Sequence, residues 1–349
     1  MISEITMAHT EKQSLTQNSA IVQKFTALMP GFLLCLVIGM SAKFISEHHG
    51  GPTILYALLM GMALNYLSTE GSCVAGIQFS AKSVLRFGIA LLGARITIEQ
   101  LMSLGITPIV LVLIGVPATI FFSYVLGRWL KLGKAQSILA GASVGICGAS
   151  AALAVSAVLP EDKESEKNLI FTVICVTGLS TVAMILYPLL VPILGFSEAE
   201  SGIFLGATIH DVAQVVGAGY MISDSVGDVA TFTKLLRVAM LVPVVLVISI
   251  VVARQSGQKK KEGSSVALPG FLIAFVLVVL ANSSGYVPPV ITDAMVDLSR
   301  WCLIVAMVGL GMKASFKELA AMGWRPIVLM VTETVFLAAL VTVGLYITR

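Results

Sequence analysis

Four polar side chains interrupt an apolar stretch of the chain, in the segment LGATIHDVAQVVGAG at residues 205–219. They are Thr208, His210, Asp211 and Gln214. A charged Asp at the centre of a bilayer costs roughly 2.5–3.5 kcal/mol on insertion scales, and an unperturbed His titrates near neutral pH. The pair of His210 and Asp211 therefore predicts a proton relay or a binding site. The alternative is that both lie at a membrane edge in ordinary solvent.

Gln214 follows His210 by four residues and Asp211 by three, so the three side chains share a face if the segment is helical. A single amide can also be a packing hydrogen bond between membrane helices. Both interpretations stay open.

A second Gly-rich segment, LAGASVGICGASAALAVSAVLP at residues 139–160, contains GASV at 141–144, which resembles GATI at 206–209. Gly costs about 1 kcal/mol more than Ala in a helix, so clustered Gly at membrane depth indicates close helix packing or an interrupted helix. Interruption frees main-chain groups, and the N-terminal end of a half-helix can hold an anion. The sequence leaves open whether the interrupted segments 139–159 and 205–222 are broken crossing helices or re-entrant hairpins.

Lys234 and Arg237 open another apolar stretch at i, i+3 spacing. They either extend to the membrane interface or lower the cost of an anion near the core, where Arg237 could pair with Asp211. Arg95, Glu99 and the segment EDKESEK at 161–167 are expected to be solvated loop charges. We predict ion coupling by His210 and Asp211, and the candidate substrate-binding residues are Ser143, Gly145, Cys147, Gly148, Ser150, Thr208, Gln214, Lys234 and Arg237.

The composition predicts a membrane protein that must position these residues on helices. Of 349 residues 57% are hydrophobic and 12% are charged, whereas soluble proteins carry about 25% charged residues. A helix crosses a bilayer with about 20 apolar residues. We therefore predict an all-α polytopic protein with about 11 spans, at residues 28–46, 52–67, 82–95, 105–130, 135–159, 168–194, 200–222, 229–253, 267–285, 292–312 and 324–347.

Basic loops predict the orientation, because Lys and Arg accumulate on the cytoplasmic side. The strongest cluster is RQSGQKKKE at 254–262, and counting from it places the N-terminus inside. Residues 1–26 resemble a flexible cytoplasmic tail, and residues 27–349 are expected to form one transmembrane transporter domain. The net charge of +3 is explained by orientation and does not require a nucleic-acid partner.

An internal repeat is visible between residues 93–111 and 311–329, which align without gaps. The matching Gly and Pro positions are harder to obtain by chance than matching Leu or Val. By the span count one copy lies outside and the other inside, which predicts an inverted repeat, with elements near 82–131 and 292–347, as in many secondary transporters.

Motifs for other functions do not occur in the sequence. There is no Walker A motif, GxSxG or HExxH, so we expect neither an enzyme nor a cofactor. The five cysteines show no CxxC or metal-ligand spacing, so no metal site is expected.

Five stretches resemble the YeiH family of bacterial inner-membrane proteins, called sulfate exporters. They are LLGARITIEQL (91–101), GICGASAALAVSAVL (145–159), LGATIHDVAQVVGAG (205–219), KLLRV (234–238) and GMKASFKELAAMGWRP (311–326). The family is distantly similar to the cation/proton antiporter and bile-acid symporter folds, in which a core domain moves against a panel domain. One departure is that the two Gly-rich segments lie much closer in sequence than the two repeat copies do, which leaves the repeat topology open.

Together these features predict a secondary active transporter of a small anion, sulfate or an organic sulfonate, in the bacterial inner membrane. The resemblance implies export by alternating access, and His210 and Asp211 suggest proton coupling. One alternative is a sodium-coupled transporter of another small organic anion in which Asp211 and Gln214 hold Na⁺; another is a membrane sensor or scaffold that transports nothing. A homodimer is an open alternative for the oligomeric state.

Overall fold

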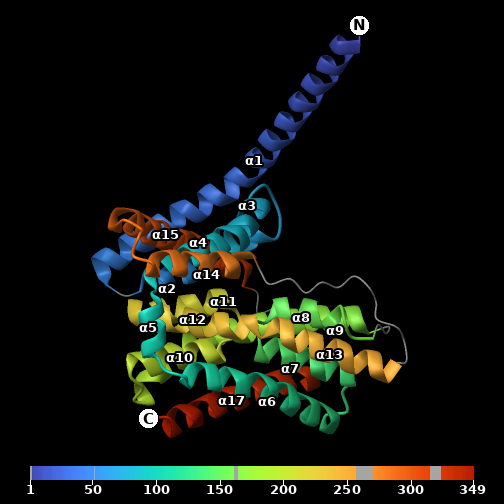
Figure 1. Cartoon of the computed structure of the whole chain (residues 1–349), viewed down its shortest axis with the longest axis vertical. Helices are drawn as coiled ribbons and strands as arrows, with labels where there is room; N and C mark the ends of the chain where they lie inside the picture. Colours follow the sequence, from blue (N-terminus) through green and yellow to red (C-terminus); the bar gives the residue numbers. More distant parts are fainter. Residues whose placement is uncertain (1, 51, 161–163, 257–269, 315–323) are drawn as a thin grey trace. The chain divides into compact units, whose positions relative to one another are not determined.

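The structure is a computed structural model that describes residues 2–50, 52–160, 164–256, 270–314 and 324–349. These residues form helices and no strand, as the composition predicts. Seven helices are long and apolar enough to cross a membrane (Figure 1): Thr26–His49, Val74–Arg95, Thr107–Trp129, Ser165–Ile193, Asp224–Val252, Pro289–Lys313 and Trp324–Ile347.

The remaining predicted spans coincide with shorter elements. Thr53–Ala63 and Gly270–Ser283 are single apolar helices, whereas the predicted spans 135–159 and 200–222 each consist of two half-helices. The described residues therefore contain seven helices long enough to cross a membrane, and the total of about 11 crossings remains a prediction.

Some predicted features fall partly outside the described residues. These are the acidic loop at 161–163, the basic loop at 257–262 and the second repeat copy at 315–323. The orientation and the inverted repeat remain predictions for this reason. The predicted tail at 1–26 also stays a prediction, because the backbone of α1 alone does not test it.

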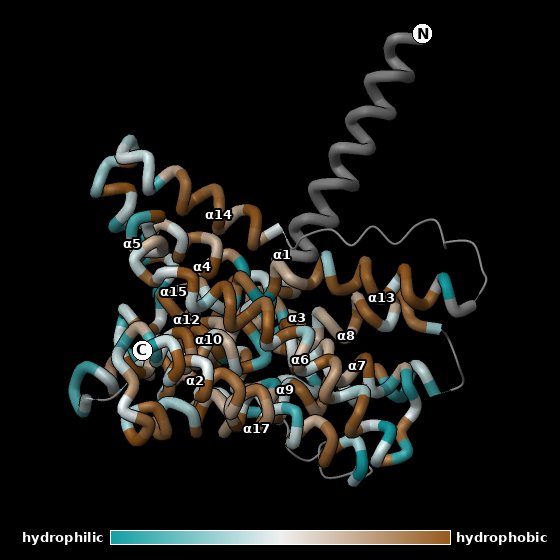
Figure 2. Tube along the Cα trace, turned by 60° about the horizontal axis from the view of Figure 1, so that its bottom comes forward, coloured by the Kyte–Doolittle hydropathy of each residue, from teal (hydrophilic) through white to brown (hydrophobic). Residues whose placement is uncertain are grey.

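Hydrophobic residues follow the long helices, and hydrophilic residues gather near helix ends and in the loops (Figure 2). Many of the large apolar side chains of these helices are exposed on their outer faces, for example Leu113, Phe121 and Leu186. Exposed apolar faces of this extent are expected where lipid, and not water, surrounds a helix.

The described chain divides into two compact units. The first comprises Met1–Gly88 with Arg300–Ala314, and the second comprises Ile89–Ser299 with Ser315–Arg349. The first unit contains α1 (Ile2–His49), α2 (Thr53–Ala63), the 3-10 helix η1 (Asn65–Ser68), α3 (Val74–Phe79), the π-helix η2 (Ser80–Val84) and the end of α15 (Pro289–Lys313).

Glycines allow close helix contacts inside the first unit. A Cβ at Gly31 of α1 would meet the Cys73 carbonyl, and one at Gly61 of α2 would meet the Val308 carbonyl of α15. Asn65 holds the end of α15, since its Nδ2 donates to the Met312 carbonyl at 2.6 Å.

The second unit contains the candidate site, and its helices are introduced here. They are the 3-10 helix η3 (Gly93–Arg95), α5 (Ile98–Ser103), α6 (Thr107–Trp129), α7 (Lys134–Gly145), α8 (Ala149–Ser156), α9 (Ser165–Ile193), α10 (Glu198–Thr208), α11 (Val212–Tyr220), α12 (Asp224–Ala239), α13 (Leu241–Ser256), α14 (Gly270–Ser283) and α17 (Trp324–Ile347). The helix α4 (Leu85–Leu92) joins the two units along the chain.

The first interruption separates α7 from α8. The helix ends at Ile146, whose φ and ψ are −110° and −83°, and Gly148 has φ 65° and ψ −126°. A positive φ favours Gly because it has no Cβ, so the Gly in the sequence ICG is what permits this break. The predicted interruption of 139–159 is therefore present, and it lies at residues 146–148.

The second interruption separates α10 from α11. Ser197 begins α10 with a capping box: its hydroxyl accepts from Glu200 N–H, and the Glu200 carboxylate accepts from Ser197 N–H. The helix ends where Ile209 and Asp211 become extended, with ψ of 139° and 143°. The break therefore falls on the polar residues of the segment.

Glycines near both interruptions serve close packing. A Cβ at Gly206 of α10 would meet the Ala230 carbonyl of α12, and one at Gly141 of α7 would lie 2.5 Å from Ser123 Cβ of α6. Packing and interruption were alternatives in the sequence, and the structure contains both at different residues.

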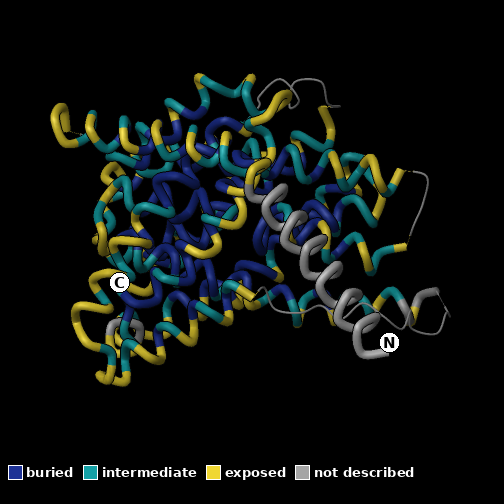
Figure 3. The backbone as a smooth tube through the Cα atoms, turned by 90° about the horizontal axis from the view of Figure 1, so that it is seen from above, coloured by how far each residue is buried: buried dark blue, intermediate teal, exposed yellow. Residues whose placement is uncertain are grey.

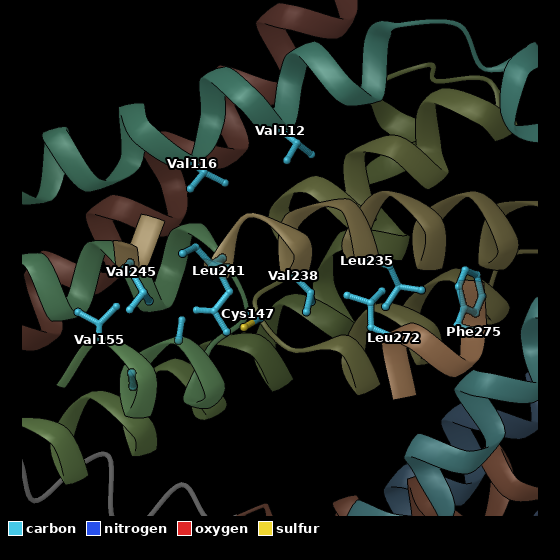
Figure 4. Packing of buried hydrophobic residues seen from close by; sticks show 14 of the residues in the cluster. Val112, Val116, Cys147, Val155, Leu235, Val238, Leu241, Val245, Leu272 and Phe275 are labelled. Atoms are coloured by element: carbon cyan, nitrogen blue, oxygen red, sulfur yellow. The ribbon is translucent and has the colours of Figure 1, made fainter. Parts of the chain in front are cut away.

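An apolar core surrounds the first interruption. Cys147, between α7 and α8, lies among side chains of α6, α12 and α13 (Figure 4). In Figure 3 buried residues occupy long continuous stretches of the chain, and exposed residues lie mainly along outer faces and at helix ends. The labelled core residues in Figure 4 are Val112, Val116, Cys147, Val155, Leu235, Val238, Leu241, Val245, Leu272 and Phe275.

Candidate functional site

Lys234 of α12 connects the two interruptions directly. Its side chain is 0% exposed, and its Nζ donates to the Ile146 carbonyl at 2.7 Å and to the Ile209 carbonyl at 3.0 Å. These carbonyls belong to the ends of α7 and α10, where an α-helix leaves acceptors without an intrahelical donor. Lys234 therefore caps both half-helices.

Arg237 lies one turn further along α12 and makes the same connection with its guanidinium. Nε donates to the Gly145 carbonyl at 2.9 Å and Nη2 to the Val144 carbonyl at 2.6 Å, both on α7. Nη1 donates to the carbonyls of Gly206 at 3.3 Å and Ile209 at 3.1 Å on the α10 side. Four hydrogen bonds thus join one side chain to two helix ends.

The electrostatics of this arrangement are favourable, because a helix C-terminus carries about −0.5 elementary charge and attracts cations. Arg237 is only 1% exposed, which contradicts one of the two alternatives in the sequence, that the two cations extend to the membrane interface. Main-chain carbonyls at the C-terminal ends of α7 and α10 supply the partners that make burial of these charges tolerable.

His210 lies in the second interruption and is fully buried. Its Nε2 is 2.9 Å from the Thr334 hydroxyl of α17, which itself donates to the Met330 carbonyl at 2.8 Å. The Thr334 oxygen therefore accepts from His210 Nε2–H. Among the described residues His210 Nδ1 has no hydrogen-bond partner.

Asp211 is half-buried and caps α11. Its carboxylate accepts from Ala213 N–H at 3.0 Å, and its own N–H donates to Ser180 Oγ of α9 at 3.0 Å. A carboxylate at a helix N-terminus is stabilised by the positive end of the helix dipole. The residue can therefore remain charged in this position.

The predicted hydroxyl donors are engaged within their own helices. Ser143 Oγ donates to the Leu139 carbonyl at 2.6 Å, and Thr208 Oγ1 donates to the Phe204 carbonyl at 2.6 Å. A hydroxyl has one proton, so each would have to rotate to donate to a ligand. Ser150, the second residue of α8, is exposed.

Gln214 is 4% exposed, and its Oε1 has no hydrogen-bond partner among the described residues. It lies in the first turn of α11, where it follows the interruption. A buried amide oxygen without a donor is costly, so Gln214 has unused capacity for a ligand or a water molecule.

The two interruptions lie next to each other. A Cβ at Gly148 would be 3.6 Å from the His210 carbonyl, and Gly148, the N-cap residue of α8, has no side chain to cap that helix. The first N–H groups of a helix lack intrahelical acceptors and can bind an anion. The predicted residues Gly145, Gly148, His210, Lys234 and Arg237 are thus brought together.

Arg95 was expected to be a solvated loop charge, but in the structure it is paired with two carboxylates. It is 19% exposed and forms ion pairs with Asp224 at 2.7 Å and Asp228 at 2.9 Å, while the Tyr220 hydroxyl donates to Asp228 at 2.5 Å. Arg95, Asp224 and Asp228 line an open pocket. The partners lie about 130 residues away in sequence, so local spacing gives no signal for the pairs.

Glu333 is a buried ionisable residue that the sequence interpretation missed. It is 0% exposed in α17, next to Thr334. A signal was available, because Glu333 is the one acidic residue in the apolar segment 324–347, and ionisable residues inside membrane helices are rare and functional.

Comparison with known proteins identifies the family. Residues 30–330 match the family model described as "Conserved hypothetical protein 698". A UPF0324 membrane protein of Chlorobaculum tepidum is 51% identical, over 91% of this chain and 89% of that protein. The "UPF0324 membrane protein TauZ" of Paracoccus denitrificans is 47% identical, over 92% and 96% of the two chains.

A further UPF0324 membrane protein, from Rhizobium meliloti, is 46% identical over 91% of this chain and 92% of its own. The match extends across both interruptions and α12, so it covers the whole candidate site. The family resemblance seen in the sequence is confirmed, and the chain belongs to the UPF0324 family of membrane proteins, the family of "Conserved hypothetical protein 698".

Proposed function

We propose that this protein is a secondary active transporter of a small, singly charged anion such as an organic sulfonate. The observation that carries the proposal is the junction of two interrupted helices around the buried cations Lys234 and Arg237. Interrupted helices with main-chain groups facing a shared site are the build of many secondary transporters. A scaffold or sensor gains nothing from charges buried at this cost.

The charges at the junction indicate the class of substrate. Lys234 and Arg237 contribute two positive charges, and Asp211 contributes one negative charge. The ends of the four half-helices carry about +0.5 or −0.5 each and cancel in sum. With a neutral His210, a net charge of +1 remains, which a monovalent anion neutralises and a doubly charged sulfate exceeds.

The anion would bind at the free N-terminus of α8, near Gly148. There the N-cap residue of α8, Gly148, offers no side chain to the first N–H groups, whereas Asp211 already caps α11. Gln214 and the rotatable hydroxyls of Ser143 and Thr208 supply further polar atoms. In this proposal the positive charges of Lys234 and Arg237 stabilise the anion electrostatically, and their hydrogen bonds keep the ends of α7 and α10 together.

Proton coupling is assigned to His210 and Asp211, as the sequence predicts. Asp211 is half-buried beside the junction, so a change in its protonation would change the charge at the junction and with it the affinity for the anion. We further propose export across the bacterial inner membrane, with the N-terminus inside, about 11 crossings and an inverted repeat.

Transport by the full-length protein in proteoliposomes tests the proposal. Vesicles preloaded with a labelled organic sulfonate should release the label faster than protein-free vesicles, and labelled sulfate should be released more slowly. Absence of both binding and movement over a broad anion panel would refute the substrate class. Release that requires sodium in place of a proton gradient would refute the proton coupling.

The matched variant is Asp211→Asn, because Asn is as good a helix cap as Asp. We expect it to fold normally and to transport with a rate that no longer depends on pH. Glu200→Gln is the control, since Glu200 lies in the first turn of α10, at the end opposite the junction, where it pairs with Arg349. An unchanged pH dependence in Asp211→Asn would contradict the coupling role of Asp211.

A further inference from the structure

Glu333 is an acidic residue buried in the middle of α17. Its side chain is 0% exposed, and neither carboxyl oxygen has a hydrogen-bond partner among the described residues. Removing a carboxylate from water without pairing it costs several kcal/mol, whereas the neutral acid avoids most of this cost. The position therefore favours a protonated carboxyl group.

The hydroxyl nearest Glu333 is already engaged by another acceptor. Ser123 of α6 lies beside the Glu333 carboxyl group, and its Oγ donates to the Ser137 carbonyl of α7 at 2.6 Å. Because that hydroxyl has only one proton, it cannot also donate to a Glu333 carboxylate, although its oxygen can still accept from a protonated carboxyl group.

Among the described residues, one ionisable side chain on a neighbouring helix interacts with Glu333: Cys175 of α9. A thiol is a weak donor and does not compensate a carboxylate. On α10, Glu200 pairs with Arg349, which lies 16 residues beyond Glu333, so these charges are at the far end of α17.

The same stretch of α17 contacts the second helix interruption. Thr334 follows Glu333 directly and accepts a hydrogen bond from His210. A shift or rotation of α17 that brings Glu333 to water would also displace the Thr334 hydroxyl from His210. The protonation state of Glu333 and the geometry of the interruption are therefore mechanically linked.

We propose that Glu333 is a proton-binding site: its carboxyl group holds a proton in this conformation and releases it to water when α17 moves. In the release step the O–H bond of the carboxyl group breaks and water accepts the proton. The site lies outside the α10–α11 interruption, and it extends the proposed function with a second protonation site that does not depend on the identity of the substrate.

Infrared difference spectroscopy of the full chain in lipid nanodiscs tests the proposal without a transport assay. The wild-type protein should show the carbonyl stretch of a buried carboxylic acid at neutral pH, and the band should disappear as the pH is raised. Glu333→Gln should lack this band, and Glu200→Gln should retain it. A wild-type protein without the band, or a band that persists in Glu333→Gln, would overturn the proposal.

Two further variants keep the test decisive if Glu333→Gln fails to fold. Ser123→Ala removes the acceptor and should shift the position of the band. Thr334→Val should change the pH at which the band disappears, because it breaks the link to His210. An unshifted band in Ser123→Ala would overturn the assigned site, and an unchanged pH in Thr334→Val would overturn the link.

Three additional outcomes separate this inference from neighbouring ideas. Loss of the band on adding sodium at fixed pH would identify a cation site and overturn the proton site. If the band behaves as expected but no anion moves in proteoliposomes, the proton site stands and the proposed function fails. If anions move and the band is absent, only the proton site fails.

Discussion

Replacing Arg237 with Ala is the sharpest test of the junction, because one guanidinium caps two helix ends. The side chain donates four hydrogen bonds, at 2.6–3.3 Å, to carbonyls of Val144, Gly145, Gly206 and Ile209. Hydrogen bonds to charged groups contribute about 1.5–3 kcal/mol each, so a simple sum gives roughly 6–12 kcal/mol. That sum is an upper bound, because neighbouring interactions are not additive.

A better magnitude comes from variants of other proteins that remove one partner of a buried ion pair, in which the free energy of unfolding falls by about 3–5 kcal/mol. We therefore expect Arg237→Ala to lower the free energy of unfolding by about 4 kcal/mol. The unfolding entropy is about 2.1 cal/mol/K per residue, which for 349 residues gives roughly 1.4 °C per kcal/mol, so the unfolding temperature should fall by roughly 5–6 °C. Arg237→Lys keeps the charge but not the planar donor fork, so it should lose about half as much.

Thermal unfolding of the purified protein in detergent measures this difference. Arg128→Ala is the matched control, because Arg128 is an exposed arginine in the last turn of α6 and surface substitutions usually change stability by less than about 0.5 kcal/mol. If Arg237→Ala unfolds within about 2 °C of the wild type, the guanidinium is not holding the two half-helices and the account of the junction is wrong.

Two other predictions concern the backbone and pH. Gly148→Ala should lower the free energy of unfolding by about 1–3 kcal/mol, because Gly148 has φ 65°. Gly145→Ala is the control and should lower it less, because the new Cβ would make an ordinary contact at 3.4 Å. Equal losses of unfolding free energy in the two variants would contradict the strain argument. The hydrogen bond from Arg349 lowers the pKa of Glu200 from 4.5 to about 2. The pair therefore makes its full contribution to stability when the pH is above the ordinary pKa of a glutamate. This contribution is lost as the pH falls toward the lowered pKa of Glu200. The difference in unfolding temperature between wild type and Glu200→Gln should therefore shrink from about pH 5 to pH 2, and a constant difference would exclude the pair as its cause.

The sequence predicts the interruptions because their signals are local. Gly148 is needed where φ is positive, and Asp211 is a strong helix cap, so both breaks follow from residue type and position. The all-helical class follows from composition in the same way. The exact positions of the two breaks could not be predicted. The predicted interrupted segments extended over whole spans, whereas the breaks occupy only residues 146–148 and 209–211.

The partners of the buried charges could not be predicted from side-chain types. Lys234 and Arg237 bind main-chain carbonyls, and every residue has a carbonyl, so no sequence pattern marks the acceptors. Arg95 was misjudged for a related reason, because its partner Asp228 follows 133 residues later. Only the fold brings such groups together.

The capping of α7 by α12 has a consequence for biosynthesis. Arg237 follows Gly145 by 92 residues, and Lys234 follows Ile146 by 88. At about 5–20 residues per second, roughly 4–18 s pass between translation of the carbonyls and translation of the cations that cap them. During that interval the carbonyls at the end of α7 must be solvated or held by another factor.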